Sequence, residues 1–220
     1  LAASMSDAAG RLMGTLSPEQ KALMNLPLES LERFSWHYIP RMRKGLALRE
    51  LAPDQKALAL DLLKTGLSDA GYKTAQEIMS LELVLIEREK NGSMPMVRDP
   101  GSYYFVIFGT PSREQPWGWR AEGHHISANF TIVGGSVQEN VISNTPLFFG
   151  AEPALVQGGP MKGLRPLAGV EDKARALIDG LDDSQRALAI IGQELPVDIF
   201  TGNSRAPSLA AQLNPMGLSR

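Results

Sequence analysis

Residues 117–132, WGWRAEGHHISANFTI, decide how the rest of the chain is interpreted. They contain two of the three tryptophans and two of the three histidines in the sequence. From Ile126 onward, apolar and polar residues alternate, which is the pattern of a β-strand with one buried face. Before Gly123 the same alternation occurs with the opposite parity. The stretch therefore predicts one long strand with an irregularity near Gly123.

A β-bulge at Gly123 accounts for this change of parity. A strand that keeps the same buried face needs an extra residue to reverse its alternation, and glycine adopts unusual dihedrals without steric cost. His124 then lies within the bulge. The bulge places the following polar side chains on one face: Arg120, Glu122, His125, Ser127 and Asn129.

This polar face carries the residues of a candidate active site. Two imidazoles and a carboxylate, here His124, His125 and Glu122, are a ligand set for zinc, iron or manganese. Alternatively, Glu122 orients a histidine as a general base, and Arg120 pairs with an anionic group of a substrate. We therefore predict a divalent-metal-dependent enzyme in which Glu122 and His125 are catalytic. Arg120 and Asn129 position its substrate.

Two other functions are compatible with the same residues. In the first, Trp117, Trp119 and Arg120 line a pocket for a polar or carbohydrate-like small molecule, because exposed indole faces stack on sugars and cations. In the second, the domain is structural: Glu122 pairs with Arg120, and the histidines make structural hydrogen bonds. Solvent exposure of the two tryptophans favours binding, whereas burial places both in the core.

Helices precede and follow this region. The longest predicted helix covers residues 69–90, where apolar residues recur at three- and four-residue steps. Shorter helices are expected at about 5–13, 18–24, 53–64, 170–179 and 184–193. One octapeptide pattern marks three of the starts: LSPEQKAL at 16–23, LAPDQKAL at 51–58 and LDDSQRAL at 181–188. Its Ser or Asp caps free N–H groups, and its Gln takes the return position of a capping box.

Strands are predicted in the middle of the chain. Residues 102–109, SYYFVIFG, form a continuous apolar run typical of a strand that is buried on both faces. Further strands are expected at 137–143 and 145–149. The order of elements predicts an α+β fold. It has a helical N-terminal region, a central antiparallel sheet of about four to five strands over residues 102–149, and helices again at about 170–193.

Two further features lie near the third tryptophan. His37 is a third imidazole that folding can bring to the site, although its aromatic neighbours favour a buried structural histidine. Arg41, Arg43 and Lys44 form a small basic cluster. Such a cluster is typical of a solvated surface, and an anion-binding loop is the alternative.

Composition limits the partners of the chain. A net charge of −2, with Lys and Arg spread along the sequence, gives no basic stripe, so nucleic-acid binding is not expected. No apolar run reaches the roughly 18–20 residues that cross a bilayer, so no membrane partner is expected. The absence of cysteine excludes thiolate-bound metals and thiol nucleophiles. A small-molecule ligand or substrate is the expected partner.

Six motifs, in order along nearly the whole chain, resemble the domain-of-unknown-function family 3500. They are FSWHYIP (34–40), YYFVIFGTP (103–111), WGWRAEGHHISANFT (117–131), FGAEP (149–153), GLRPL (163–167) and DIFTGN (198–203). The resemblance implies a family without an established activity. Members of this family typically continue beyond the position of Arg220. The resemblance therefore implies that residues 1–220 are a single domain, the N-terminal part of a longer family domain. Partners of the His124 and His125 site are then expected beyond Arg220.

The compartment depends on how the first residue arose. The chain begins at Leu1 without methionine. An exported, periplasmic location follows if this start reflects removal of a signal peptide, and a cytoplasmic location follows otherwise. Many members of the family that the chain resembles are exported, which implies the first alternative.

Overall fold

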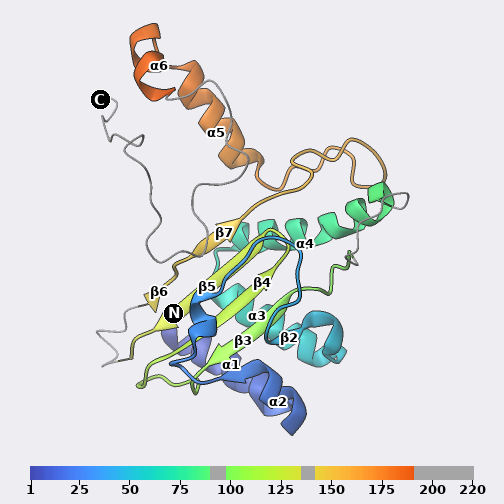
Figure 1. The fold of residues 1–220 in the computed structure, drawn as a ribbon, viewed down its shortest axis with the longest axis vertical. Helices are drawn as coiled ribbons and strands as arrows, with labels where there is room; N and C mark the ends of the chain where they lie inside the picture. Colours follow the sequence, from blue (N-terminus) through green and yellow to red (C-terminus); the bar gives the residue numbers. More distant parts are fainter. Residues whose placement is uncertain (90–97, 135–141, 191–220) are drawn as a thin grey trace. The chain divides into compact units, whose positions relative to one another are not determined.

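The computed structural model of the chain describes residues 1–89, 98–134 and 142–190 (Figure 1). It divides into two compact units, Leu1–Pro166 and Leu167–Arg220. The second unit contains α5 (Ala168–Asp179) and α6 (Asp183–Ala189), which confirm the predicted helices there. Residues 191–193 of the last predicted helix lie outside the described residues. In the described part of the chain, no helix has the length and apolar character needed to cross a membrane.

The helices predicted before the strands are present in the first unit. They are α1 (Ala2–Thr15), α2 (Pro18–Met24), α3 (Pro53–Thr65) and α4 (Asp69–Glu89). At the start of α2, Ser17 Oγ accepts from the Gln20 N–H, and Gln20 Oε1 accepts from the Ser17 N–H at 3.0 Å. Gln55 and Gln185 make the same return contact at α3 and α6. The repeated octapeptide therefore marks three helix starts.

The strands form one mixed, mostly antiparallel sheet. Its main path is β1 (Asn25–Leu26), β3 (Tyr104–Phe108), β4 (Trp117–Gly123), β5 (Ile126–Ile132) and β6 (Ile142–Ser143). The remaining strands are β2 (Leu46–Ala47), which pairs with β3, and β7 (Leu147–Phe149), which pairs with β5. Among the described strands, only β1 and β3 pair in parallel. The α+β prediction is confirmed, and the N-terminal region adds β1 and β2 to the predicted sheet.

The predicted bulged strand is instead a hairpin of two strands. β4 and β5 are antiparallel, and their adjoining ends, Gly123 and Ile126, lie opposite each other. His124 and His125 therefore form the turn between them. The residues on either side of a two-residue turn, i and i+3, lie opposite each other and face the same side of the sheet. The buried side chains therefore change from odd to even positions across the turn, just as they would across a bulge. The alternation alone does not distinguish the two structures.

Gly123 is required for a reason other than a bulge. A Cβ at this position would overlap the aromatic ring of Tyr103, so glycine is needed for the close approach of the two residues. The unusual backbone conformation belongs to His125, whose φ is +59°. This left-handed conformation costs a non-glycine residue about 1 kcal/mol. Contacts around the turn offset that cost.

The hairpin has an apolar face and a polar face, both of which are covered. On the apolar face Trp119 stacks on Phe130 with 4.4 Å between ring centroids, and Gly66, after the end of α3, lies against both rings. Figure 1 shows α3 and α4 crossing behind the strands. The segment between β1 and β2 crosses in front of them (Figure 1) and covers the polar face, where Arg120 contacts Glu32.

Candidate functional site

The polar face of the hairpin contains a buried network of charges. The side chains of Arg120 and Glu122 are each 1% exposed, and Arg120 Nε lies 3.5 Å from Glu122 Oε2. Arg120 Nη2 donates to Glu32 Oε1 at 2.6 Å. The other Glu122 oxygen, Oε1, accepts from Arg43 Nε at 2.6 Å. Glu122 therefore lies between two guanidinium groups, which compensate the cost of burying its charge.

Ser127 and Asn129 complete this network on β5. Ser127 Oγ donates to Glu122 Oε2 at 3.1 Å. Asn129 Nδ2 donates to Ser127 Oγ at 2.9 Å and to the Pro146 carbonyl at 2.9 Å. The structure thus brings together Arg120, Glu122, Ser127 and Asn129, as the sequence predicts. They bond to one another in a closed arrangement, which is typical of a polar core.

Arg43 fixes the segment that covers this face. Its Nη2 donates to three backbone carbonyls, those of His37, Ile39 and Gly123, at 2.9, 2.6 and 3.1 Å. Burial lowers the pKa of Arg43, and the Glu122 carboxylate opposes that shift. The sequence places Arg43 in a basic run that is typical of a solvated surface. The structure shows a buried anchor, which no local sequence pattern reveals because its partners are distant in the chain.

At the tip of the hairpin, His124 is paired with a carboxylate that the sequence prediction missed. His124 Nδ1 lies 2.6 Å from Oε1 of Glu82, a buried residue of α4. Arg98 Nη1 lies 4.0 Å from the same carboxylate oxygen, and Arg98 also pairs with Glu89 at 2.8 Å. The Tyr103 hydroxyl donates to the His124 carbonyl at 3.0 Å. The backbone and the ring of His124 are therefore both held in place.

Glu82 and Arg98 both contact Nδ1 of His124, and the shorter contact is the one with Glu82. A carboxylate only accepts hydrogen bonds, so the 2.6 Å contact with Glu82 favours a proton on Nδ1 of the imidazole. Arg98 Nη1, which only donates, lies 3.3 Å from the same nitrogen and is the longer of the two contacts. In the neutral ring, Nε2 then carries the lone pair. A histidine held in this way by a buried carboxylate has the geometry of a general base. The sequence predicts Glu122 as the carboxylate beside a histidine, whereas in the structure Glu82 contacts His124.

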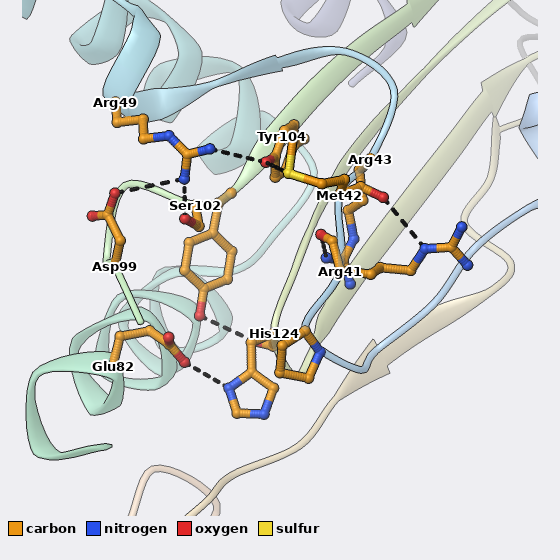
Figure 2. A pocket seen from close by; sticks show the side chains of 11 residues that line it. Arg41, Met42, Arg43, Arg49, Glu82, Asp99, Ser102, Tyr104 and His124 are labelled. Carbon is orange, nitrogen blue, oxygen red and sulfur yellow. Dashed lines mark hydrogen bonds and ion pairs between the residues drawn. The ribbon is translucent and has the colours of Figure 1, made fainter. Parts of the chain in front are cut away.

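His124 and Glu82 border a cavity of about 510 Å³. A second group of lining residues surrounds Arg49, which donates to the Ser102 hydroxyl and, at 3.2 Å, to the Tyr104 hydroxyl. Figure 2 shows this group and the His124–Glu82 pair at different sides of the cavity. Apolar surface from proline, methionine and tyrosine lies between them. The cavity has the size and mixed lining of a small-molecule site.

His125 occupies a different environment from its neighbour. Its backbone N–H donates to the Tyr38 carbonyl, and its carbonyl accepts from the Gly150 N–H, both at 2.8 Å. Its ring centroid lies 4.1 Å from that of His124. Burial, followed by the charge of His124, lowers the pKa of His125 to about 4. His125 is therefore neutral at pH 7, and its buried Nδ1 has no hydrogen-bond partner among the described residues.

Trp117 and Trp119 belong to the core rather than to a pocket wall. They are 0% and 1% exposed. Neither indole N–H has a hydrogen-bond partner among the residues that the structure describes. The expected stacking surface for a carbohydrate is therefore covered. On the apolar face of the hairpin, Trp119 stacks on Phe130 and lies against Gly66, which follows α3.

The predicted metal ligands engage different partners. Across residues 1–89, 98–134 and 142–190, no group of three or more histidine, aspartate or glutamate side chains is arranged to hold a metal ion. Glu122 lies against Arg43 and Arg120 on the polar face of the hairpin, whereas His124 contacts Glu82 on α4. The two imidazoles remain adjacent in the turn.

The fold and the site define an α+β protein with a buried ion network and a histidine–carboxylate pair beside a cavity. The sequence matches the family described as protein of unknown function (DUF3500) over residues 1–219, and the chain belongs to this family. The resemblance seen in the sequence motifs is thereby confirmed. Comparisons with curated proteins and with solved structures give no match.

Proposed function

We propose that the cavity beside His124 binds a small polar molecule and that His124 transfers a proton to or from it. The observation that carries this proposal is the 2.6 Å contact between His124 Nδ1 and Glu82 Oε1 at the cavity wall. It supports a proton on Nδ1, with Nε2 as the basic atom of the neutral ring. The pair therefore has the parts of a general acid–base catalyst.

Arg49 is the group that we assign to ligand positioning. Its side chain is 38% exposed, and its ion pair with Asp99 is long, at 3.6 Å. A partly solvated guanidinium keeps donors for a carboxylate or phosphate group, and planar anions match its geometry. The Tyr104 hydroxyl, 3.2 Å from Arg49 Nη2, is a second polar group at the same side of the cavity. A ligand with an anionic end and a transferable proton fits this arrangement.

The reaction class follows from the groups that line the cavity. The Ser102 hydroxyl accepts from Arg49, and among the described residues no base accepts a hydrogen bond from it. Nucleophilic catalysis by this serine therefore has less support than proton abstraction or activation of a water molecule by His124. A divalent metal at His124, His125 and Glu122 is a separate proposal. It requires Glu122 to leave two arginine partners, so it has weaker support.

Nitrogen-15 NMR of histidine-labelled protein tests the acid–base proposal. We expect the neutral His124 ring to be protonated at Nδ1 and its Nε2 signal to shift on titration with malonate, a small dicarboxylate probe. Arg49→Gln should weaken malonate binding about tenfold, because a charge-assisted hydrogen bond contributes roughly 1.5 kcal/mol. Arg88→Gln, at an exposed ion pair with Glu152, is the matched control and should bind malonate as the wild type does.

Two outcomes contradict the proposal. One is a neutral His124 ring protonated at Nε2, because the basic lone pair is then on Nδ1, against Glu82, and is not available to a ligand. The other is malonate binding that Arg49→Gln does not change. Metal analysis of the same preparation separates the alternative: one divalent ion per chain, lost in His124→Ala, supports the metal proposal.

A further inference from the structure

We propose that a second cavity, beneath residues 41–44, is a binding site for a phosphate group. This cavity has a volume of about 310 Å³. It shares Arg41, Met42 and Arg43 with the first cavity, and its separate wall includes His37 and Lys44. It is bordered by the charged network of the hairpin rather than by the His124–Glu82 pair. The proposal is therefore independent of the acid–base function.

The charge of the cavity is positive after internal pairing. Its two carboxylates, Glu32 and Glu122, are bound by Arg120 and Arg43 at 2.6 Å each. Arg41 and Lys44 also line the cavity, and neither pairs with a carboxylate among the described residues. Three cations of the lining, Arg41, Arg43 and Lys44, thus face two carboxylates, which leaves a net charge of +1. Phosphate at neutral pH, with a charge between −1 and −2, complements it.

The wall of the cavity is fixed, whereas its two unpaired cations are at the surface. Arg43 is held by backbone carbonyls and by Glu122, so the cationic floor does not need to reorganise on binding. Arg41 donates through Nε to the Met42 carbonyl at 3.3 Å. In Figure 2 its guanidinium points away from the His124–Glu82 pair. Arg41 therefore lines both cavities, but its Nη donors are turned away from the histidine–carboxylate pair.

Two further observations indicate a positive potential at this place. Burial lowers the pKa of His37, and the charges of Arg41, Arg43 and Arg120 lower it further, although Glu122 opposes them. Arg120 Nε is buried and has no hydrogen-bond partner in the described residues. This Nε lies 3.5 Å from Glu122 Oε2, so the charge of Arg120 adds to the positive potential behind the Glu122 wall of the cavity.

Calorimetric titration of the intact chain with inorganic phosphate tests the proposal. The titration is run at pH 7 and constant ionic strength, with chloride as the matched salt. We expect saturable binding in the wild type and about tenfold weaker binding in Lys44→Gln and in Arg41→Gln, because each removes a charge-assisted contact worth roughly 1.4 kcal/mol. Lys44 lines only the second cavity, which makes it the decisive position.

The controls locate the binding. Lys21→Gln removes an exposed charge on α2 and should leave phosphate binding unchanged. Arg49→Gln reports separately on phosphate binding in the first cavity. Glycerol phosphate distinguishes the source of the group: equal affinity indicates a phosphorylated small molecule, and binding of inorganic phosphate alone indicates the free ion. The proposal is overturned by binding no stronger than that of chloride, or by binding that only Arg49→Gln weakens.

Discussion

The apolar and polar faces of the β4–β5 hairpin are equally buried but are stabilised by different interactions. Trp117 and Trp119 are 0% and 1% exposed on one face, and Arg120 and Glu122 are each 1% exposed on the other. Burying an indole is favourable by roughly 25 cal/mol per Å² of apolar area. Burying a charge costs several kcal/mol, roughly what its ion-pair and hydrogen-bond partners must supply in return. The two faces are equally buried, but a given kind of substitution is therefore expected to change the free energy of unfolding by different amounts on each.

The two faces depend on different properties of their side chains. Glu122 contacts Arg43, Arg120 and Ser127, so its charge and its acceptor atoms are both in use. The indole N–H of Trp119 contacts no acceptor among the described residues, so only the volume and shape of this ring are in use. A change of charge should therefore matter most on the polar face, and a change of volume on the apolar face.

Among substitutions that keep most of the side chain, the largest effect is expected for Glu122→Gln, which changes a charge but almost no volume. The substitution leaves the buried guanidinium groups of Arg43 and Arg120 without their shared counter-charge. Breaking a buried ion pair from one side costs about 3–5 kcal/mol, so we expect a loss of about 3 kcal/mol in the free energy of unfolding. Urea denaturation at pH 7 measures it.

Asp7→Asn is the matched control for this substitution. Asp7 pairs with Arg113 at 2.7 Å, but the two side chains are 48% and 64% exposed. Exposed pairs contribute about 0–1 kcal/mol, so we expect little change in stability. A cost for Glu122→Gln as small as that for Asp7→Asn would contradict the importance of the buried network.

A smaller effect is expected for Trp119→Phe, which reduces volume but keeps an apolar ring. Phenylalanine preserves part of the stacking on Phe130 and removes an indole N–H that has no partner among the described residues. The lost ring leaves a small cavity, for which we expect a cost of about 1–2 kcal/mol. The same urea denaturation measures this cost.

Trp119→Ala provides the calibration for the apolar face. Removing the whole ring should cost about 3–5 kcal/mol, more than Trp119→Phe by the difference in cavity volume. The comparison between the faces fails if Trp119→Phe destabilises the protein more than Glu122→Gln. That result would mean that the packing of side-chain volume, rather than charge compensation, contributes most to stability on both faces.

The sequence was sufficient to predict elements whose signals are local. The capping pattern around Ser17 and Gln20 predicted the start of α2, and the recurring apolar residues predicted α4 from Asp69. The apolar run that contains β3 predicted a strand buried on both faces, which is confirmed. Each of these predictions depends on residues within a few positions of one another, so propensity and periodicity carry enough information.

The parts of the site that the sequence did not predict depend on distant contacts. Glu82 lies in an amphipathic helix, where a buried carboxylate looks like any other polar position until His124 is placed beside it. Arg43 acquires its role only when its segment covers the hairpin. The hairpin was predicted as a bulged strand because both structures produce the same alternation. Its turn lacks the Asn-Gly or Asp-Gly pair that usually marks one.

The smallest effect is expected at the turn that joins the two faces, where His125→Asn changes the pH dependence of stability. The folded-state pKa of His125 is lowered to about 4, whereas an unfolded histidine titrates near about 6.5. Between these values the unfolded chain binds more protons, so stability falls as pH decreases from about 6.5 to about 4. Asparagine tolerates the left-handed conformation of this position and does not titrate.

Thermal denaturation at a series of pH values from 5 to 7, a range chosen because most carboxylates titrate below it, measures the slope. We expect a shallower decrease of the melting temperature in His125→Asn than in the wild type, with a difference at pH 7 of less than about 1 kcal/mol in unfolding free energy. His37→Gln is the comparison, since burial also lowers the pKa of His37. An unchanged slope in His125→Asn, together with a lost slope in His37→Gln, would assign the pH dependence to the segment that covers the polar face instead of to the turn.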